Sequence, residues 1–217
     1  MPRSPVPPPG TLYVNYATGT DDLTGVWRLR PGGSPERIAT LPANGLPNGL
    51  TLDQHHDALY VADSVLGTVW RVSLQDGTRT AWASGTELGP TAFLGANGIR
   101  EHDGAVWVSN TDRGTVLRIP ICPDGTAGPI ETRLTGIDGI DDFAFTGHGD
   151  TLLAARNAAD EVVHATPGAG APTVVLTHQD GLSSPTSVAV CGSTAYVTSA
   201  AFATLQDPNL LLARIDT

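Results

Sequence analysis

Short apolar runs recur along the chain with a nearly constant spacing. Each run has an aromatic or leucine residue at its centre, and the five centres are Tyr13, Tyr60, Trp107, Leu153 and Tyr196. Successive centres lie 47, 47, 46 and 43 residues apart. Self-similarity at this period indicates that one structural unit is used several times, with each copy packing against the next.

Within one repeat, apolar residues alternate with polar ones over short segments. The second repeat predicts four strands, at 48–52, 58–62, 69–74 and 79–82. The third repeat predicts the same order, at 98–100, 106–108, 115–119 and 130–133. The connections are short and polar, as at Asp76-Gly77, which favours antiparallel pairing. No window keeps a 3.6-residue apolar period, so helices should be nearly absent. Four-stranded units of this length are typical of the blades of an all-β propeller, with about five blades visible here.

The two end repeats each provide only three predicted strands. The first has strands at 11–16, 25–30 and 36–40, with no apolar run ahead of them to form an innermost strand. The last has strands at 187–190, 195–199 and 210–215, with no fourth. An open circle leaves unpaired strand edges, through which we expect self-association. Residues 1–10 are rich in proline and are predicted to be an arm outside a single propeller domain at 11–217.

Composition narrows the range of partners. The net charge is −10, and all 12 basic residues are arginine, without a basic run, which excludes an ordinary nucleic-acid-binding surface. No stretch approaches the roughly 18–20 apolar residues that cross a bilayer, and the first residues lack the apolar core of a secretory signal. We therefore expect a cytoplasmic protein that binds a small molecule, not nucleic acid or membrane. Cys122 and Cys191 lie in different repeats and are expected to be free, buried thiols.

Four polar residues occupy matching positions in successive repeats. Asn48, Asn97, Asp141 and Thr186 each open a predicted innermost strand, 10 or 12 residues ahead of the centre of their repeat. Equivalent positions of a radial repeat converge on its axis, so these side chains should meet at one end of the central channel. Oxygen ligands from Asn and Asp suit Ca²⁺ or Mg²⁺ and also serve Zn²⁺. The sequence thus predicts a polar site on the axis.

A purely structural role for these residues stays open. Asn-Gly is a strong turn signal, and the pair at 44–45 shows that it occurs here away from the axial position. Asn48 and Asn97 can therefore serve strand entry instead of ligand binding. Asp63 and Asn110, at the ends of second strands, are predicted to bond local backbone groups.

Several segments resemble a known family. LPNGLTLDQHHDALYVADSVLGTVWRV, GANGIREHDGAVWVSNTDRGTVLRI, IDDFAFTGHGDTLLAARN and SPTSVAV are similar to blades of the regucalcin/gluconolactonase (senescence marker protein, LRE-like) family of six-bladed propellers. The resemblance covers residues 11–217. It implies that the chain lacks the first blade, the innermost strand of the second and the strand that completes the sixth. A closed five-bladed ring is the alternative.

The same resemblance implies a chemistry. It assigns a metal site to Asn97 and Asp141, with calcium, or alternatively zinc, magnesium or manganese, as the cofactor. Asn48 and Thr186 would lie on the substrate side, and Asp141 would assist water attack or proton transfer in the hydrolysis of a small lactone or ester. The family's third ligand, a Glu of the first blade, has no counterpart in this sequence. Two other functions stay open: a non-hydrolytic small-molecule-binding or cyclase-type propeller of secondary metabolism, and an NHL-like interaction scaffold.

Overall fold

The computed structural model describes residues 10–215. They form 18 strands and two three-residue 3-10 helices, Asn157–Ala159 and His178–Asp180, so the prediction of an all-β chain is confirmed. Neither helix in this part of the chain has the length and apolar character needed to cross a membrane. The predicted proline-rich arm lies outside the described residues except for Gly10.

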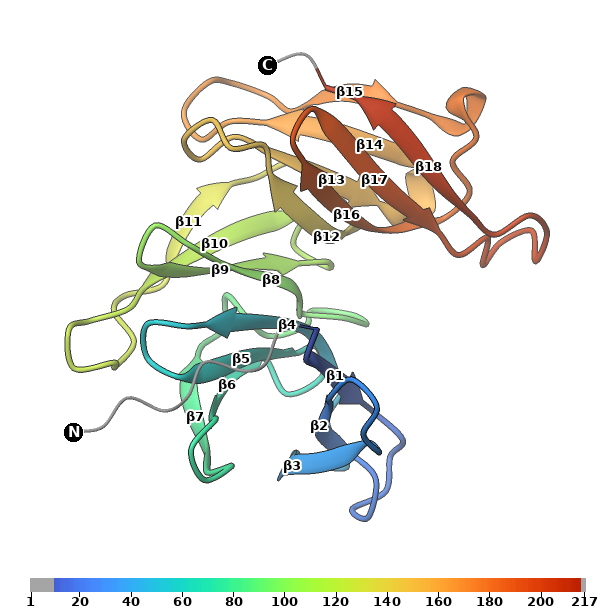
Figure 1. Ribbon diagram of the computed structural model, residues 1–217. Coiled ribbons are helices and arrows are strands. Elements are labelled where there is room, and N and C mark those ends of the chain that lie inside the picture. The colour runs from blue at the N-terminus through green and yellow to red at the C-terminus, as the bar shows by residue number, and fades with distance from the viewer. Residues whose placement is uncertain (1–9, 216–217) are drawn as a thin grey trace.

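The strands form five antiparallel sheets, each built from consecutive strands, as expected for propeller blades (Figure 1). The first blade consists of β1 (Leu12–Tyr16), β2 (Gly25–Leu29) and β3 (Glu36–Thr40). The second consists of β4 (Pro47–Asp53), β5 (Ala58–Asp63), β6 (Thr68–Ser73) and β7 (Arg79–Ser84). The third consists of β8 (Ala96–His102), β9 (Ala105–Asn110), β10 (Thr115–Pro120) and β11 (Glu131–Leu134). These bounds lie within a few residues of those predicted from the sequence.

The fourth and fifth blades continue the series. The fourth consists of β12 (Ile140–Phe145), β13 (Leu152–Arg156), β14 (Glu161–Ala165) and β15 (Thr173–Leu176). The fifth consists of β16 (Pro185–Cys191), β17 (Thr194–Ser199) and β18 (Asn209–Arg214). The two end blades are three-stranded within residues 10–215, as the sequence predicts. Tyr13 lies in β1 and its repeat partner Tyr60 lies in β5, so β1 is the equivalent of a second strand.

The hydrophobic core is divided among the interfaces between neighbouring blades. The four clusters of buried side chains are centred on Val26 and Val61, on Tyr60 and Ile99, on Trp107 and Phe143, and on Leu153 and Val188. Each cluster joins one blade to the next. No cluster of described residues joins the first blade to the fifth, and the blades form an open arc in Figure 1. The first and fifth blades therefore share no hydrophobic cluster among the described residues.

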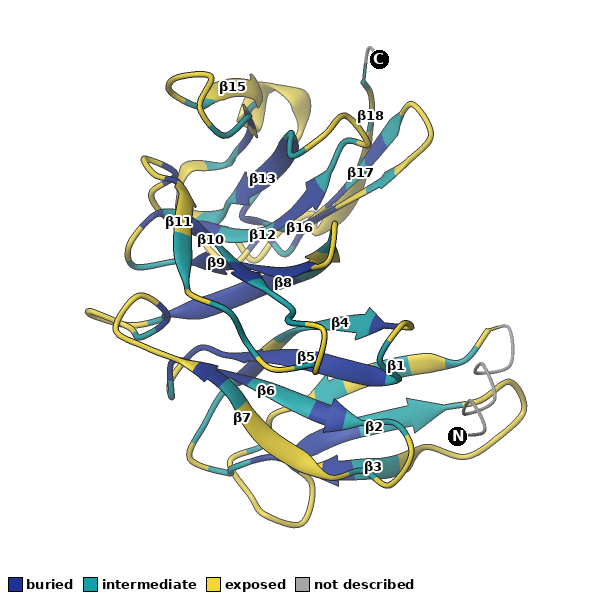
Figure 2. Cartoon of the chain, turned by 90° about the vertical axis from the view of Figure 1, so that its left-hand side faces the viewer, coloured by how far each residue is buried: buried dark blue, intermediate teal, exposed yellow. Residues whose placement is uncertain are grey.

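Burial follows the position of a strand within its blade (Figure 2). All six residues of β5 and all six of β9 are buried, because neighbouring blades cover both faces of these second strands. In the outermost strand β15 three of four residues are exposed. This explains why β5 and β9 each begin with a run of at least four apolar residues.

One expectation about the core was wrong. Cys122 and Cys191 are free, as predicted, but Cys122 is only half-buried and Cys191 is exposed. Cys191 closes β16 in the fifth blade, whose outer face is not covered by another blade of the described chain, so its side chain remains accessible to solvent.

Candidate functional site

The four innermost strands share a backbone irregularity at the same place. β4, β8, β12 and β16 each pair with the next strand through a register shift just after their first residue. These β-bulges contain the residues that the sequence singled out: Asn48, Asn97, Asp141 and Thr186. A bulge turns a side chain away from the regular pleat, and here it directs four polar side chains to one end of the channel.

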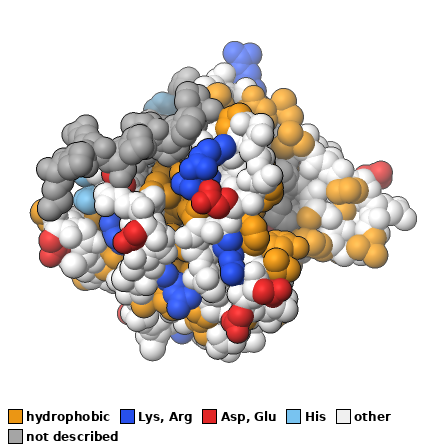
Figure 3. All heavy atoms as spheres, turned by 60° about the horizontal axis from the view of Figure 1, so that its bottom comes forward, with side chains coloured by type: hydrophobic (Ala, Val, Ile, Leu, Met, Phe, Trp, Pro, Cys, Tyr) orange, Lys and Arg blue, Asp and Glu red, His pale blue; other side chains and the backbone are white. Residues whose placement is uncertain are grey.

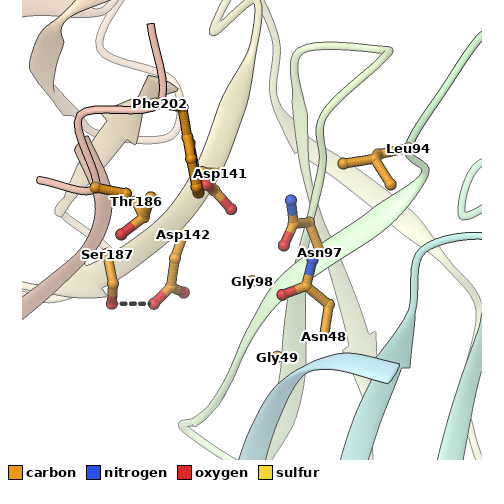
Figure 4. Close-up of a pocket in the computed structure, with 11 residues that line it drawn as sticks. Asn48, Gly49, Leu94, Asn97, Gly98, Asp141, Asp142, Thr186, Ser187 and Phe202 are labelled. Atoms are coloured by element: carbon orange, nitrogen blue, oxygen red, sulfur yellow. Dashed lines mark hydrogen bonds between the residues drawn. The ribbon is translucent and has the colours of Figure 1, made fainter. Parts of the chain in front are cut away.

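The structure brings these four residues together around one cavity, called the axial pocket below (Figure 4). Its volume is about 560 Å³, within the range of small-molecule sites. The lining residues are Asn48, Gly49, Leu94, Asn97, Gly98, Asp141, Asp142, Thr186, Ser187, Ala200 and Phe202. The prediction of a shared axial location is thereby realised for all four residues.

Glycine follows each asparagine for a reason that is not a hairpin turn. Both Asn-Gly pairs lie inside strands, where the neighbouring innermost strand passes very close. A Cβ on Gly49 would lie 2.9 Å from the backbone nitrogen of Ile99, and one on Gly98 would lie 2.7 Å from Cα of Asp142. Only a residue without a side chain permits this approach. These two pairs therefore do not form hairpin turns, whereas the strand-entry role agrees with their positions at the starts of β4 and β8.

One wall of the axial pocket carries two amide groups. Nδ2 of Asn97 donates a hydrogen bond to Oγ1 of Thr111 at 2.9 Å, and Nδ2 of Asn48 donates to Oγ of Ser64 at 3.3 Å. The amide oxygens of both residues point toward the pocket in Figure 4. Asn97 is only 3% exposed, so its side chain is almost fully enclosed by neighbouring residues.

The opposite wall carries two carboxyl groups in different environments. Oδ2 of Asp142 accepts hydrogen bonds from Nη2 of Arg100 and Oγ of Ser187, each at 2.6 Å. Its other oxygen, Oδ1, is buried and has no hydrogen-bond partner. Burial, and then the negative charge of Asp142, raise the pKa of Asp141 to about 7, although a hydrogen bond with Asn97 opposes the shift. The pocket thus holds a carboxyl group that changes charge near neutral pH.

Other polar residues of the second strands hold the backbone in place, as predicted. Asp63 Oδ1 accepts hydrogen bonds from the backbone N–H groups of Leu46, Val65 and Leu66. Asn110 donates to the carbonyl oxygens of Glu87 and Gly89. Asp63 therefore supports the turn between β5 and β6 and the loop before β4, Asn110 supports the loop before β8, and neither residue lines the axial pocket.

Several residues that line the pocket, or that bond to a lining side chain, carried no usable signal in the sequence. Ser187 was visible only as the neighbour of Thr186, and Arg100 lies on the same strand as Asn97 without being part of the repeating pattern. Leu94 and Phe202 come from loops between strands, where strand periodicity gives no information. Such residues can be found only once the blades are placed in space.

The donor set can be compared with the needs of a hard divalent cation. Asp141 and Asn97 provide oxygen atoms of the kind that Ca²⁺ and Mg²⁺ prefer. Within residues 10–215 no group of three or more His, Cys, Asp or Glu side chains is placed to hold a metal ion. A cation here would thus rely on adjacent carboxylates, on amide carbonyls and on water.

No family model matches the sequence, and no curated protein matches it either. Solved structures do match. A calcium-binding protein, regucalcin, from Agrobacterium tumefaciens superposes with a TM-score of 0.66 at 16% identity, covering 96% of this chain and 74% of that one. Luciferin-regenerating enzyme gives a TM-score of 0.63 at 16% identity, covering 81% and 63%. A chain of the nidogen/laminin complex gives 0.63 at 18% identity, covering 87% and 67%.

The likeness is one of fold. Identities of 16–18% are too low to transfer an activity, and the chain spans about two thirds of the length of the structures it matches. Regucalcin and luciferin-regenerating enzyme belong to the group that the sequence segments resemble, which supports the resemblance at the level of architecture. Five blades are present where that resemblance implies six.

Proposed function

We propose that the axial pocket binds a divalent cation and hydrolyses a small ester or lactone beside it. The observation that carries the proposal is the convergence of Asn97 and Asp141, with a raised carboxyl pKa, on one cavity of suitable size. Support comes from the fold shared with regucalcin, a calcium-binding protein. Calcium is the first choice of cation, with zinc, magnesium and manganese as alternatives.

The chemistry of the donors fits such a cation. The negative charge of ionised Asp141 is unfavourable because the group is buried and lies next to a second carboxylate, so the pKa of Asp141 is raised. A bound cation would favour the ionised form of Asp141 and would offset the charge repulsion between the two carboxylates. The carbonyl oxygen of Asn97 completes a set of hard oxygen ligands on rigid strands.

A bound cation would polarise the carbonyl group of the substrate. Asn48 and Thr186 line the same pocket and would hydrogen-bond the polar part of the substrate. Asp141 would accept a proton from the attacking water as the water oxygen adds to the carbonyl carbon. The proton then passes to the departing alkoxide as the ester C–O bond opens, giving an acid and an alcohol.

Calorimetric titration of the chelator-stripped protein with Ca²⁺, Zn²⁺ and Mn²⁺ at pH 8 tests the cation site. Asp141→Ala and Asn97→Ala should each weaken binding by about tenfold or more, because each removes a direct ligand. Asp21→Ala, an exposed carboxylate in the first blade, is the control and should bind like wild type. The proposal fails if none of the three cations binds, or if both pocket variants bind as wild type does.

A second function is favoured by a different property of the same pocket. With a pKa of about 7, Asp141 is partly protonated at neutral pH and can donate a hydrogen bond to a neutral ligand without any metal. This would suit a non-hydrolytic small-molecule-binding or cyclase-type propeller. Ligand binding or activity that persists in excess chelator, and disappears in Asp141→Ala, would favour this alternative.

A further inference from the structure

The axial pocket has two chemically different zones. Its floor consists of the polar residues that open the innermost strands, described above. The apolar residues Leu94, Ala200 and Phe202 also line the pocket and are called the rim below. Figure 4 shows Leu94 and Phe202 on opposite sides of the pocket. Phe202 is 64% exposed. Leu94, Ala200 and Phe202 together place apolar surface next to the polar residues of one small-molecule-sized cavity.

The two sides of the rim come from different loops. Leu94 lies in the loop that joins β7 to β8, and its neighbour Phe93 is 76% exposed. Ala200 and Phe202 lie in the loop that joins β17 to β18. The two loops are far apart in sequence, yet apolar side chains from both line the same cavity.

The first loop is fixed by one carboxylate. Oδ2 of Asp112 accepts hydrogen bonds from the backbone N–H groups of Thr91, Ala92 and Phe93, at 2.7, 2.6 and 2.8 Å. Oδ1 accepts a fourth from the N–H of Leu94, at 3.1 Å. Desolvation raises the pKa of Asp112, but these four bonds outweigh it and lower the pKa to about 2. The loop that carries Leu94 is therefore held by a permanently charged anchor.

The second loop is fixed by its own backbone. Ala201 is fully buried, and its N–H donates to the carbonyl oxygen of Ser183 at 2.9 Å. Leu205 donates its N–H back to the carbonyl oxygen of Ala201 at 2.7 Å. Both residues adopt positive φ angles, 53° and 55°, which non-glycine residues rarely do outside over-determined turns. This turn sets the position of Phe202 between them.

We propose that the rim is a hydrophobic subsite, and that the ligand of the axial pocket carries an alkyl chain or an aryl group next to its polar end. This proposal rests on the proposed function in one respect: it takes the polar end of the ligand to be a carbonyl group that binds at the floor. A polyhydroxylated sugar lactone is a poor match, because its hydroxyl groups would lose hydrogen bonds to water against Leu94 and Phe202. Asp112 acts as a positioning residue for the subsite.

Binding of simple amides tests this proposal without any hydrolysis. Amides keep the carbonyl group, so acetamide, hexanamide, nonanamide and 4-phenylbutyramide form a series with a constant head and a growing apolar part. Affinity, measured by calorimetry or by chemical-shift titration, should rise along the series by up to about fourfold for each methylene group that becomes buried. An affinity that does not depend on the apolar part overturns the proposal.

Substitutions test whether the affinity gained from the apolar part of the amide comes from contact with the rim. Phe202→Ser should weaken 4-phenylbutyramide binding by about tenfold, whereas Phe202→Leu should retain most of the affinity. Asp112→Asn should also weaken it, because an amide cannot accept as strongly from four N–H groups. Val174→Ser, at an exposed apolar position of the outermost strand β15, is the matched control and should bind like wild type. Equal losses in Phe202→Ser and Val174→Ser contradict the proposal.

Calcium titration of the same variants separates this proposal from the proposed function. Phe202→Ser and Asp112→Asn should bind Ca²⁺ as wild type does, since neither residue belongs to the polar floor. If Ca²⁺ fails to bind the wild type but the amide series keeps its dependence on chain length, the cation site is wrong and the subsite stands. If Ca²⁺ binds and the amide series is flat, the subsite is wrong and the cation site stands.

Discussion

Asp141 and Asp142 are adjacent in sequence, yet the structure gives them different chemical surroundings. Asp142 accepts hydrogen bonds from Arg100 and Ser187. The pKa of Asp141 is raised by burial and by the charge of Asp142, and a hydrogen bond with Asn97 opposes this shift. The pair therefore combines one carboxyl group that is held by an arginine and a serine with one that titrates near pH 7. A carboxyl group whose pKa is strongly raised by burial and by a neighbouring charge is typical of functional sites.

The raised pKa of Asp141 makes the stability of the metal-free protein depend on pH. Below about pH 4 the group is protonated in both folded and unfolded chains, and it imposes no penalty. Between about pH 4 and pH 7 only the unfolded chain releases the proton, so the free energy of unfolding falls as pH rises. Above pH 7 the full cost of the buried charge is present.

Asp141→Asn should remove this dependence. With chelator present, we expect the variant to be more stable than wild type by roughly 2 kcal/mol at pH 8 and by much less at pH 4.5, after allowance for partial exposure. Urea unfolding at the two pH values measures the difference. An advantage that is equal at both pH values, or one that also occurs in Asp21→Asn, would show that the titration of Asp141 is not its cause.

At the scale of the strand, the axial pocket depends on how closely the innermost strands approach one another. Gly49 and Gly98 lie where a side chain would collide with the backbone of the next blade. The bulges at these positions then direct Asn48 and Asn97 toward the axis. In β4 and β8 the glycine thus allows the strands to approach closely, and the bulge directs the asparagine side chain into the pocket.

Gly98→Ala should therefore destabilise the protein by about 1–3 kcal/mol, as expected for overpacking against a rigid neighbour. It should also weaken cation binding, because the added methyl group would contact Asp142. Gly33→Ala is the control: its Cβ would make ordinary contacts of 3.4 Å or more, and its effect should stay within about 0.5 kcal/mol. Chemical denaturation gives both values, and similar values for the two variants would contradict the role of close strand approach.

Sequence periodicity was sufficient to predict the strands but not the whole site. Alternation and polar turns placed β1–β11 and β16–β18 within a few residues, because each strand of a blade buries a predictable face. The repeat phase also found Asn48, Asn97, Asp141 and Thr186. It could not show the bulges, which depend on contact with the neighbouring blade, or the contribution of Phe202, which depends on the fold of a loop.

At the scale of the whole molecule, the two end blades leave apolar surface exposed. Leu12, Val14 and Tyr16 on β1, and Leu210 and Leu212 on β18, are each at least half exposed. β1 and β18 each have a single ladder partner among the described strands. Figure 3 shows one face of the molecule, where apolar side chains reach the surface between charged ones. Apolar residues on strands with an unpaired edge favour contact with another chain.

We therefore expect the chain to self-associate through its end blades. Val14→Glu combined with Leu212→Glu should shift the protein toward monomer, because it places charges on both apolar surfaces of a protein whose net charge is already −10. Light scattering after size exclusion measures the mass. Val174→Glu serves as the control, and a monomeric wild type at high micromolar concentration would refute the expectation.

The central claim is that a cation binds the axial pocket through a carboxyl group whose pKa lies near 7 in the free protein. Calcium titration at pH 6, performed in two buffers with different ionisation enthalpies, counts the protons released on binding. The account predicts about 0.9 proton per Ca²⁺ at pH 6, falling to about 0.1 at pH 8, and loss of this release in Asp141→Asn. Binding that releases no proton at pH 6, or a release unchanged in Asp141→Asn, would contradict it.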